Sequence, residues 1–392
     1  MGKGSVAEAG DRFDRVRRTA KVVKVQEPDR WYWMVLDHDL IRDCLQKPQV
    51  FSSCVLSPLT PEPPYKMIPI QLDPPEHTPW RQMLARFFSP KRMSEMRPDL
   101  EARCRKLIAA IAAKGECDVL EDFALPFTTS VFLDLMGLPV EELPNFLVWE
   151  NQIIAPDENG QCDPARQEAG ALSAMRYFAQ EIPRRRADPS PTPGLLTDML
   201  DWEFDGQKPS DEALVNCSLL LFMAGLDTVA SSLSYMLYHL ATQPKDREHV
   251  ARLVVNGEPT EDVVEELLRY YAVAEIGRKV TQDYELDGHQ LREGDLILFP
   301  LVSANRDHTF ISDGEKVSFD RPDAAPHLTF GAGPHRCLGS HLARIELNVA
   351  LTEWHRALAD YRVKDGAEVT AYYANVHGLL GLPVEVRPSN SL

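Results

Sequence analysis

One short stretch gathers most of the chemistry-bearing residue types of this chain. Residues 328–346, LTFGAGPHRCLGSHLARIE, hold several glycines, a proline, a histidine, an arginine and one cysteine directly before a helical pattern. Gly331 and Gly333 permit backbone conformations that other residues avoid, and they let the chain approach a flat ligand closely. Cys337 falls at the expected helix start, where unpaired N–H groups and the helix macrodipole favour a thiolate. A thiolate held in this way is a soft metal ligand.

The other cysteines do not complete a metal cage around Cys337. The chain has seven Cys, and none of them forms a C-x-x-C pair, so neither a zinc nor a redox motif is indicated. Ligation through a single thiolate, as of haem iron, therefore fits the sequence better than a zinc site. The alternative is a glycine-rich turn into a helix with a buried structural cysteine.

A second segment with chemistry-bearing residues is apolar almost all the way round. Residues 218–241, SLLLFMAGLDTVASSLSYMLYHLA, predict a helix buried through the middle of the molecule. Gly225, Asp227 and Thr228 lie in its centre, although Gly in a helix costs about 1 kcal/mol relative to Ala and a buried Asp is unfavourable. Their presence indicates a function. The alternative is a kinked helix whose Thr bonds to its own backbone.

The glycine-rich stretch and the buried helix resemble the corresponding parts of one protein family. Residues 330–339, FGAGPHRCLG, resemble the haem-binding loop of the cytochromes P-450, which has the pattern F-G-x-G-x-H-x-C-x-G. The resemblance covers nearly the whole chain and is closest to bacterial class I, camphor-hydroxylase-like members. It implies that Cys337 ligates the iron of haem b (iron protoporphyrin IX) and that Phe330 and Gly331 contact the haem.

The centre of the buried helix resembles the family's oxygen-binding groove. The stretch AGLDT, residues 224–228, carries this resemblance. It implies that Ala224 and Gly225 lie against the haem, while Asp227 and Thr228 relay protons to bound oxygen. The Thr228 hydroxyl can donate to the carbonyl of Ala224 four residues earlier, which loosens the helical ladder and leaves room for dioxygen.

A pair of charged residues on another predicted helix resembles the family's E-x-x-R motif. Glu266 and Arg269 are three residues apart, so their side chains share one helix face. The family adds an arginine from the loop before the haem segment, and the stretch FDRPD offers Arg321. A buried carboxylate between two guanidinium groups would be a structural lock and not a catalyst. Without the resemblance, a surface salt bridge is the simpler interpretation.

Four donor side chains match the family's contacts to the haem propionates. Residues 72–90, LDPPEHTPWRQMLARFFSP, resemble the helix that reaches the propionates, and His77 and Arg81 face the same way on it because they are four residues apart. Arg278 and His335 match the remaining contacts. In a chain as acidic as this one, four such groups meeting two carboxylates are electrostatically reasonable. Each of them taken alone would be an ordinary surface residue.

The expected substrate cavity rests on alignment with camphor-hydroxylase-like relatives. Ile276 stands where those enzymes have an acidic residue, and Asn375 stands where they have an apolar contact, so camphor itself is not expected. Tyr65 aligns with their substrate-bonding tyrosine; the alternative is a loop residue that caps a turn. An apolar cavity with one or two polar anchors suits a terpenoid-sized ketone or a more polar molecule. The expected lining residues are Tyr65, Leu220, Met223, Ala274, Ile276, Asn375 and Val376.

The elements that must position these residues are mainly helical. We expect a mainly α fold with a minor β part, namely the cytochrome P-450 fold with a long central buried helix over the haem and a small β-meander. Residues 278–300 alternate and contain an Asp-Gly turn, which predicts a hairpin or meander. Apolar residues spaced for helices occupy 99–114, 128–137, 141–154, 165–182 and 259–272.

The composition excludes several classes of function. The formal net charge is −17, which disfavours nucleic-acid binding and contact with anionic membranes. The N-terminus has no apolar signal core, so we expect a cytoplasmic protein with reduced thiols. The Pro-rich stretches 57–69 and 182–194 are interpreted as surface loops of one domain spanning residues 1–392, with residues 1–20 flexible.

The resemblance implies a haem-thiolate monooxygenase that hydroxylates a small hydrophobic substrate with O2. Electrons would come from a ferredoxin of the [2Fe–2S] or a similar type with an NAD(P)H-dependent reductase, docking near Cys337 on basic residues such as Arg336 and Arg344. The alternative is that these two arginines are ordinary solvated surface residues. The rival functions are a peroxide-driven peroxygenase and a haem-binding sensor or carrier without turnover. A monomer is the default state.

Overall fold

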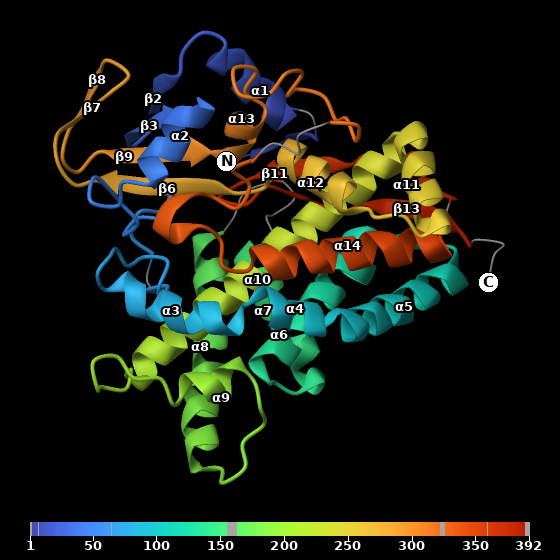
Figure 1. The fold of residues 1–392 in the computed structure, drawn as a ribbon, viewed down its shortest axis with the longest axis horizontal. Helices are drawn as coiled ribbons and strands as arrows, with labels where there is room; N and C mark the ends of the chain where they lie inside the picture. Colours follow the sequence, from blue (N-terminus) through green and yellow to red (C-terminus); the bar gives the residue numbers. More distant parts are fainter. Residues whose placement is uncertain are drawn as a thin grey trace.

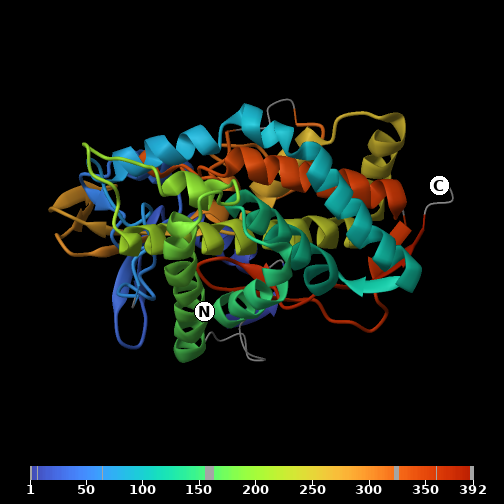
Figure 2. The same ribbon diagram turned by 90° about the horizontal axis from the view of Figure 1, so that it is seen from below.

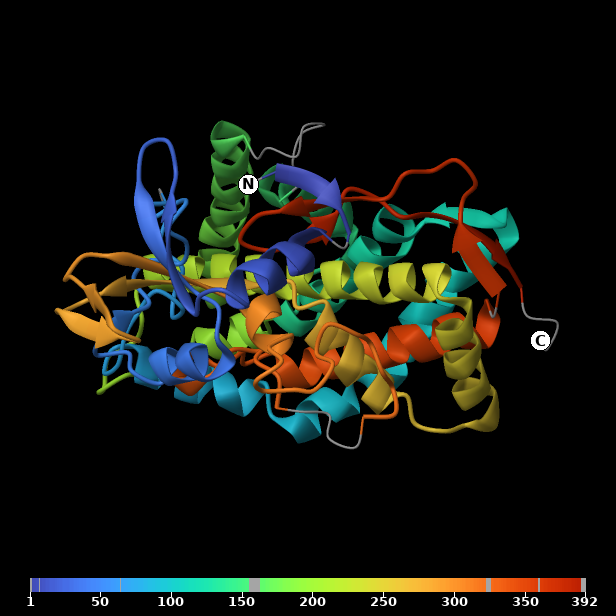
Figure 3. The ribbon, with the colours of Figure 1, turned by 90° about the horizontal axis from the view of Figure 1, so that it is seen from above.

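The computed structural model describes residues 2–6, 8–63, 65–154, 163–321, 326–358 and 360–388. Its central element is helix α10, Asp211–Thr242, which has 32 residues. Ser210 caps its N-terminus, since the Ser210 side chain accepts a hydrogen bond from the Ala213 N–H. Figures 2 and 3 show α10 running through the middle of the molecule, with other elements on both sides. Side chains such as Leu233 are fully buried. This confirms the buried helix predicted from its apolar sequence.

Helices make up most of the structure around α10. Helix α14 packs against both α5 and α10, and α6, α7 and α8 pack on other sides of α10 (Figure 1). Among the described residues, α10 is the one helix long and apolar enough to cross a membrane, and burial inside the protein explains its apolar surface. The remaining helices of more than five residues are α1 Glu8–Arg17, α2 His38–Leu45, α3 His77–Phe87, α4 Pro90–Glu95, α5 Arg97–Lys114, α6 Leu125–Met136, α7 Leu143–Ile154, α8 Pro164–Ala187, α11 Pro244–Asn256, α12 Glu261–Tyr270 and α14 Ser340–Ala357.

Several short helical segments connect these helices. The π-helical turn η1 leads into α6, and the 3-10 turn η3 lies in the glycine-rich stretch just before α14. The short segments are α9 Leu195–Met199, α13 Leu301–Asn305, η1 Leu120–Ala124, η2 Val140–Glu142 and η3 Gly333–His335. The predicted helices are therefore present, with ends that differ from the predicted ranges by a few residues.

The β part is minor, as predicted, and its largest sheet lies at one end of the molecule (Figure 1). This sheet has the order β2-β3-β9-β6-β4, and its strands are antiparallel except for the β3–β9 pair. Its strands are β2 Val22–Gln26, β3 Trp31–Val35, β4 Phe51–Ser52, β6 Glu275–Val280 and β9 Leu296–Pro300. The predicted Asp-Gly turn joins β7 Tyr284–Leu286 to β8 His289–Leu291, with φ of 48° at Asp287 and 76° at Gly288.

Two small sheets join the ends of the chain to its interior. One has the order β1-β11-β12, and the other has the order β10-β13-β5. Strand β13 pairs with both β10 and β5. The strands are β1 Gly2–Ser5, β5 Glu116–Asp118, β10 Asp360–Val363, β11 Thr370–Tyr373, β12 Gly378–Leu379 and β13 Pro383–Arg387.

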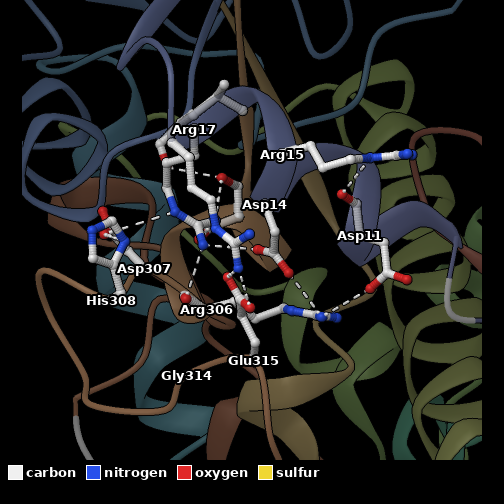
Figure 4. A network of polar contacts seen from close by, with 12 residues as sticks. Asp11, Asp14, Arg15, Arg17, Arg306, Asp307, His308, Gly314 and Glu315 are labelled. Atoms are coloured by element: carbon white, nitrogen blue, oxygen red, sulfur yellow. Dashed lines mark hydrogen bonds and ion pairs between the residues drawn. The ribbon is translucent and has the colours of Figure 1, made fainter.

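The N-terminal segment, expected from the sequence to be flexible, contains helix α1, which packs against α13. A buried network of ion pairs holds helix α1 against α13 and the loop after it (Figure 4). Arg17 donates to Asp14 at 2.8 Å and to the carbonyl oxygens of Ser303 and Arg306 at 2.8 and 2.9 Å. Arg306 pairs with Asp14 at 2.8 Å. Since the partners are almost 300 residues apart in the sequence, local patterns could not predict this attachment.

Candidate active site

The glycine-rich stretch forms a tight loop that presents Cys337. Two backbone hydrogen bonds shape it, from Gly331 N–H to the Leu328 carbonyl and from Cys337 N–H to the Phe330 carbonyl, both at 2.7 Å. Gly331 and Gly333 each have φ of 67°, in the left-handed region that other residues rarely adopt. The loop therefore needs glycine at both positions for its backbone conformation.

The thiol of Cys337 faces a space inside the protein. The side chain is exposed, yet burial by the surrounding protein raises the pKa of the thiol, although the Gly339 N–H, Arg81 and Arg336 act to lower it. A thiol that is both accessible and surrounded by protein lies on a cavity wall. Desolvation opposes the thiolate that the helix N-terminus would favour, and a bound metal ion would supply the positive charge that stabilises it.

The middle of α10 also faces an internal space. Its neighbours Phe222 and Val229 are buried, whereas Ala224 is exposed and Gly225 is half-buried. A Cβ atom on Gly225 would meet no side chain closer than Phe132, at 3.9 Å. Small residues thus leave an opening in the wall of an otherwise buried helix, at the position predicted for the oxygen groove.

Two polar residues lie at this opening. The Thr228 hydroxyl donates to the Ala224 carbonyl at 3.1 Å, which is the hydrogen bond predicted from the sequence. Asp227 is buried, and its Oδ1 accepts hydrogen bonds from Ser231 at 3.2 Å and from the Tyr372 hydroxyl at 3.4 Å. Burial raises the pKa of Asp227 to about 6, against the effect of these two hydrogen bonds. This carboxyl can therefore hold or release a proton near neutral pH.

The four predicted propionate contacts come together in the structure. The rings of His77 and His335 lie 4.1 Å apart between centroids, and the Nε2 atom of each is buried without a hydrogen-bond partner. Burial, helped by the charges of Arg81 and Arg278, lowers the pKa of His77 to about 4 and that of His335 to about 3. Arg278 is 4% exposed, and burial lowers its pKa to about 10.

These four donors fit a ligand that carries two carboxylates. Asp73 is near them, but it already accepts hydrogen bonds from the backbone N–H of Ser53 at 2.9 Å and from the Ser52 hydroxyl. Its Oδ1 lies 3.9 Å from His335 Nε2, beyond hydrogen-bond distance. Two propionates would give acceptors to both unpartnered imidazole nitrogens and counter-charges to the guanidinium groups. Together with the accessible Cys337 thiol, the residues present fit haem.

The predicted lock is present and buried. Glu266 accepts hydrogen bonds from Arg269 Nε and Nη2, both at 2.8 Å, and from Arg321 Nε at 3.0 Å. Arg269 also donates to the carbonyl oxygens of Asn305 at 2.8 Å and Gly314 at 2.7 Å. The side chains of Glu266 and Arg269 are 4% and 1% exposed, so the simpler interpretation as a surface salt bridge is wrong. These contacts attach α12 to the chain that leads into the Cys337 loop.

Most of the residues expected around the substrate come from segments that lie close together. Ala274 and Val376 form an antiparallel bridge, and the Glu275 N–H donates to the Asn375 carbonyl at 3.0 Å. Ile276 on β6 lies against the Cys337 loop, since a Cβ on Gly331 would be 3.4 Å from its Cδ1 atom.

The other three lining residues are less closely tied to that group. Leu220 and Met223 are half-buried on α10, and they precede Ala224, which lies at the opening, by four residues and one residue. Tyr65 is half-buried and packs against the main hydrophobic core, where burial raises the pKa of its hydroxyl. A substrate contact for Tyr65 therefore stays a prediction.

Sequence reasoning missed two contacts beside the site. His377 Nε2 lies 3.0 Å from Glu275 Oε1, and this buried pair holds the segment around Asn375 against β6. Arg344, expected as a docking residue, donates to Glu265 at 2.5 and 2.8 Å and lies over the Phe330 ring at 4.4 Å. The Arg344 side chain is therefore only partly available to a docking partner. Long-range pairs of this kind leave no pattern in a single sequence.

Comparison with known proteins agrees with this fold. The family model described as Cytochrome P450 matches residues 173–369. A probable cytochrome P450 127A1 from Sinorhizobium fredii is 34% identical over 318 residues, which cover 80% of this chain and 73% of that protein. A steroid C26-monooxygenase from Mycolicibacterium smegmatis is 30% identical over 356 residues, with 90% and 87% covered. A solved structure of a mutant of P450 EryK in complex with erythromycin B has a TM-score of 0.86 and 26% identity, covering 98% of this chain and 97% of that one.

The chain therefore belongs to the cytochrome P450 family. Its cofactor is haem b, and it is an oxygenase enzyme, as its relatives are. This agrees with the expectation from the glycine-rich loop, the central helix and the lock.

Proposed function

We propose that this enzyme hydroxylates a small hydrophobic substrate of terpenoid size, with O2 as oxidant and electrons from a small iron–sulfur ferredoxin. The observation that carries the proposal is the pairing of an accessible Cys337 thiol with an opening in α10 that holds Asp227 and Thr228. The site has a soft metal ligand on one element and a proton-carrying pair on another. This is what activation of dioxygen beside a thiolate-bound metal requires.

Each group of site residues has a distinct role in the proposal. Cys337 would ligate the iron of haem through its sulfur, and haem would supply the activation of dioxygen and the transfer of one oxygen atom. The His77 and His335 imidazoles, with Arg81 and Arg278, hold the propionates and fix the ring in the cavity. Phe330 and Gly331 on the Cys337 loop, and Ala224 and Gly225 on α10, would contact the haem.

Proton delivery is the work of Asp227 and Thr228. Asp227 has a pKa of about 6, so the protonated and ionised forms are both populated near neutral pH. The Thr228 hydroxyl donates its hydrogen to the Ala224 carbonyl, and rotation of the hydroxyl would free that hydrogen for oxygen in the opening. An enzyme that uses O2 needs this proton pathway, because without it the reduced oxygen leaves as peroxide. An enzyme that uses peroxide directly does not need it, so the presence of Asp227 and Thr228 favours O2 as the oxidant.

The substrate cavity is bordered by mainly apolar side chains. Ala274, Ile276 and Val376 lie on segments that the His377–Glu275 pair ties together, and Leu220 and Met223 face them from α10 in the proposal. Apolar walls with few polar anchors bind a rigid hydrocarbon skeleton with one or two oxygen functions. One relative is named for its action on a steroid, and the solved neighbour is in complex with erythromycin B.

A ferredoxin is expected to dock beside the Cys337 loop. Arg336 is exposed next to the ligand, and its backbone carbonyl accepts a hydrogen bond from Arg81 at 2.5 Å, which links the surface to the propionate contacts. An acidic partner would complement this local positive charge. Burial of α10 inside the protein agrees with a cytoplasmic enzyme, and a monomer is the simplest assembly.

The proposal is tested with haem-loaded protein, a ferredoxin, its reductase and NADH. Spectral titration with a terpenoid panel and a steroid panel identifies the ligand class, and product analysis under O2 shows whether the bound compound gains one oxygen atom. Product formed with hydrogen peroxide but not with the electron-transfer proteins would instead establish a peroxygenase. Haem binding without product from either oxidant would establish a sensor or carrier.

A further inference from the structure

The Asp227 carboxyl is held by two hydroxyl groups, and both of them reach the same oxygen atom. Ser231, one turn further along α10, donates to Oδ1 at 3.2 Å, and the Tyr372 hydroxyl donates to Oδ1 at 3.4 Å. Oδ2 accepts no hydrogen bond from the described residues and keeps some exposed surface. The two oxygens of Asp227 therefore differ, because one is fixed and the other is open to a proton.

Tyr372 reaches Asp227 from a strand that is held on both sides. It lies on β11, the middle strand of the sheet β1-β11-β12, where it pairs with Lys3 of β1 and with Gly378 of β12. Tyr372 is 6% exposed. Strand β12 in turn packs against α10, where the Tyr235 hydroxyl donates to the Gly378 carbonyl at 3.3 Å. The sheet and its contact with α10 thus fix where the phenol of Tyr372 lies.

Gly378 leaves the space that the Tyr372 phenol occupies. A Cβ atom at position 378 would collide with the hydroxyl oxygen and with ring atoms of Tyr372. The φ of Gly378 lies outside the left-handed region, so its backbone conformation does not itself call for glycine. The requirement for a residue without a side chain at this position therefore comes from the phenol, which passes over β12 to reach Asp227 on α10.

The other titratable groups around Asp227 do not offer it a positive charge. They are Glu150 on α7 and the phenol of Tyr235 on α10, and burial, with a smaller effect of the Asp227 charge, raises the pKa of each. No basic side chain forms an ion pair with Asp227 in the described ranges of the chain. The hydrogen bonds from Ser231 and Tyr372 are thus the interactions that favour the ionised carboxylate against burial.

We propose that Tyr372 is a positioning residue, which together with Ser231 holds Oδ1 of Asp227 so that Oδ2 carries the proton used in turnover. The inference rests on the proposed proton role of Asp227 and Thr228. When the proton passes to the Thr228 hydroxyl, as that role requires, the O–H bond at Oδ2 breaks and its electron pair stays on the carboxylate. The Tyr372 and Ser231 hydroxyls keep their own protons and donate to the charge that forms. Tyr372 acts through Asp227 alone.

The test is an infrared titration of the Asp227 carboxyl in the haem-loaded enzyme, which needs no substrate. The band that Asp227→Asn removes is the band of this carboxyl. Tyr372→Phe removes the hydroxyl and keeps the ring. Tyr373→Phe is the matched control, because it removes the hydroxyl of the next residue on β11, which donates to the Ser5 carbonyl. Gly378→Ala keeps the Tyr372 hydroxyl but displaces it from its position.

We expect the wild-type band of the protonated carboxyl to disappear with a midpoint at about pH 6. Tyr372→Phe should raise this midpoint by about one pH unit, because a hydrogen bond to the ionised form is lost. Gly378→Ala should move the midpoint in the same direction, and Tyr373→Phe should leave it unchanged. With a terpenoid that gives product, the pH at which the yield per NADH halves should move with the midpoint, because only the protonated carboxyl delivers a proton.

The possible failures are distinguishable. If Tyr372→Phe titrates like the wild type while Asp227→Asn loses product per NADH, Tyr372 has no positioning role and the proton function of Asp227 stands. If Asp227→Asn keeps the wild-type yield, the proposed proton role is wrong and the inference falls with it. An equal shift in Tyr373→Phe would assign the effect to strand β11 as a whole and would also overturn the inference. Tyr372→Phe alone decides the question if Gly378→Ala does not fold.

Discussion

Removal of Glu266 should destabilise the protein far more than removal of a surface carboxylate. Arg269 is 1% exposed, and its guanidinium makes two hydrogen bonds to Glu266 and three to backbone carbonyl oxygens, those of Asn305, Gly314 and Lys316. In Glu266→Ala this charge stays buried without a counter-charge. Breaking a buried pair from one side costs about 3–5 kcal/mol. That is a large part of a typical stability of about 5–15 kcal/mol.

The expected shift in melting temperature follows from the size of the chain. An unfolding entropy of roughly 2.1 cal/mol/K per residue gives about 0.8 kcal/mol/K in total for 392 residues. A loss of about 3–5 kcal/mol therefore lowers the thermal midpoint by about 4–6 °C. Circular dichroism and the haem absorption band, followed in the same sample, measure the midpoint. Glu385→Ala is the control, because its partner Arg362 is exposed and the pair should contribute little.

The pH dependence gives a second, independent check on the lock. Burial alone would raise the pKa of Glu266, but the hydrogen bonds and charge of Arg269, with the Ser318 N–H and Arg321, hold it below its usual value of 4.5. A carboxyl with a lowered pKa stabilises the fold fully above its unfolded pKa, and this stability is lost as the pH falls through the folded pKa. The gap between wild type and Glu266→Ala should thus narrow below about pH 4.5. Equal midpoints at neutral pH, or a gap independent of acid pH, would refute the reasoning.

Three further substitutions test the other parts of the site. Cys337→Ser should abolish the absorption band of the thiolate-ligated, carbon-monoxide-bound reduced protein, and survival of that band would rule out this ligand. Thr228→Ala should divert electrons from product to hydrogen peroxide by at least about tenfold, measured as peroxide released per NADH; unchanged coupling would remove Thr228 from the relay. Gly333→Ala should prevent haem incorporation, because φ is 67° and a Cβ would run into the Leu45 carbonyl oxygen. Gly366→Ala shares the positive φ but meets open space, so it should keep its haem, and equal haem content in the two variants would contradict the steric argument.

The parts of the fold that the sequence predicted are those with a local pattern. The apolar spacing over 99–114 corresponds to α5 at Arg97–Lys114, and the pattern over 259–272 corresponds to α12 at Glu261–Tyr270. Each of these helices buries one face, so its apolar residues recur with the period of an α-helix. The site residues on the Cys337 loop and at Glu266 were located because their spacing is short and fixed.

Other parts depend on partners that are distant in the sequence. Residues 182–194 are rich in proline and predict a loop, yet α8 continues through Pro183 to Ala187. Arg185 explains the extension, because it is 3% exposed and donates to Glu181 at 2.7 Å and to the Gly137 carbonyl. The favourable contacts of a buried arginine there outweigh the unfavourable helix propensity of proline. Nothing within the segment itself indicates that Gly137, 48 residues away, will accept that hydrogen bond.

The two sides of the cavity have opposite electrostatic character, which explains how one chain can hold a dianionic cofactor and also manage protons. On the cofactor side, burial lowers the pKa values of His77, His335 and Arg278, so these groups gain most from two added carboxylates. On the α10 side, burial raises the pKa of Asp227, so this carboxyl keeps its proton to a higher pH than an exposed aspartate does. Both sets of shifts have one cause, namely desolvation of ionisable groups. Two added carboxylates would give hydrogen-bond acceptors to the uncharged His77 and His335 and a counter-charge to Arg278, at a place separate from the proposed proton carrier Asp227.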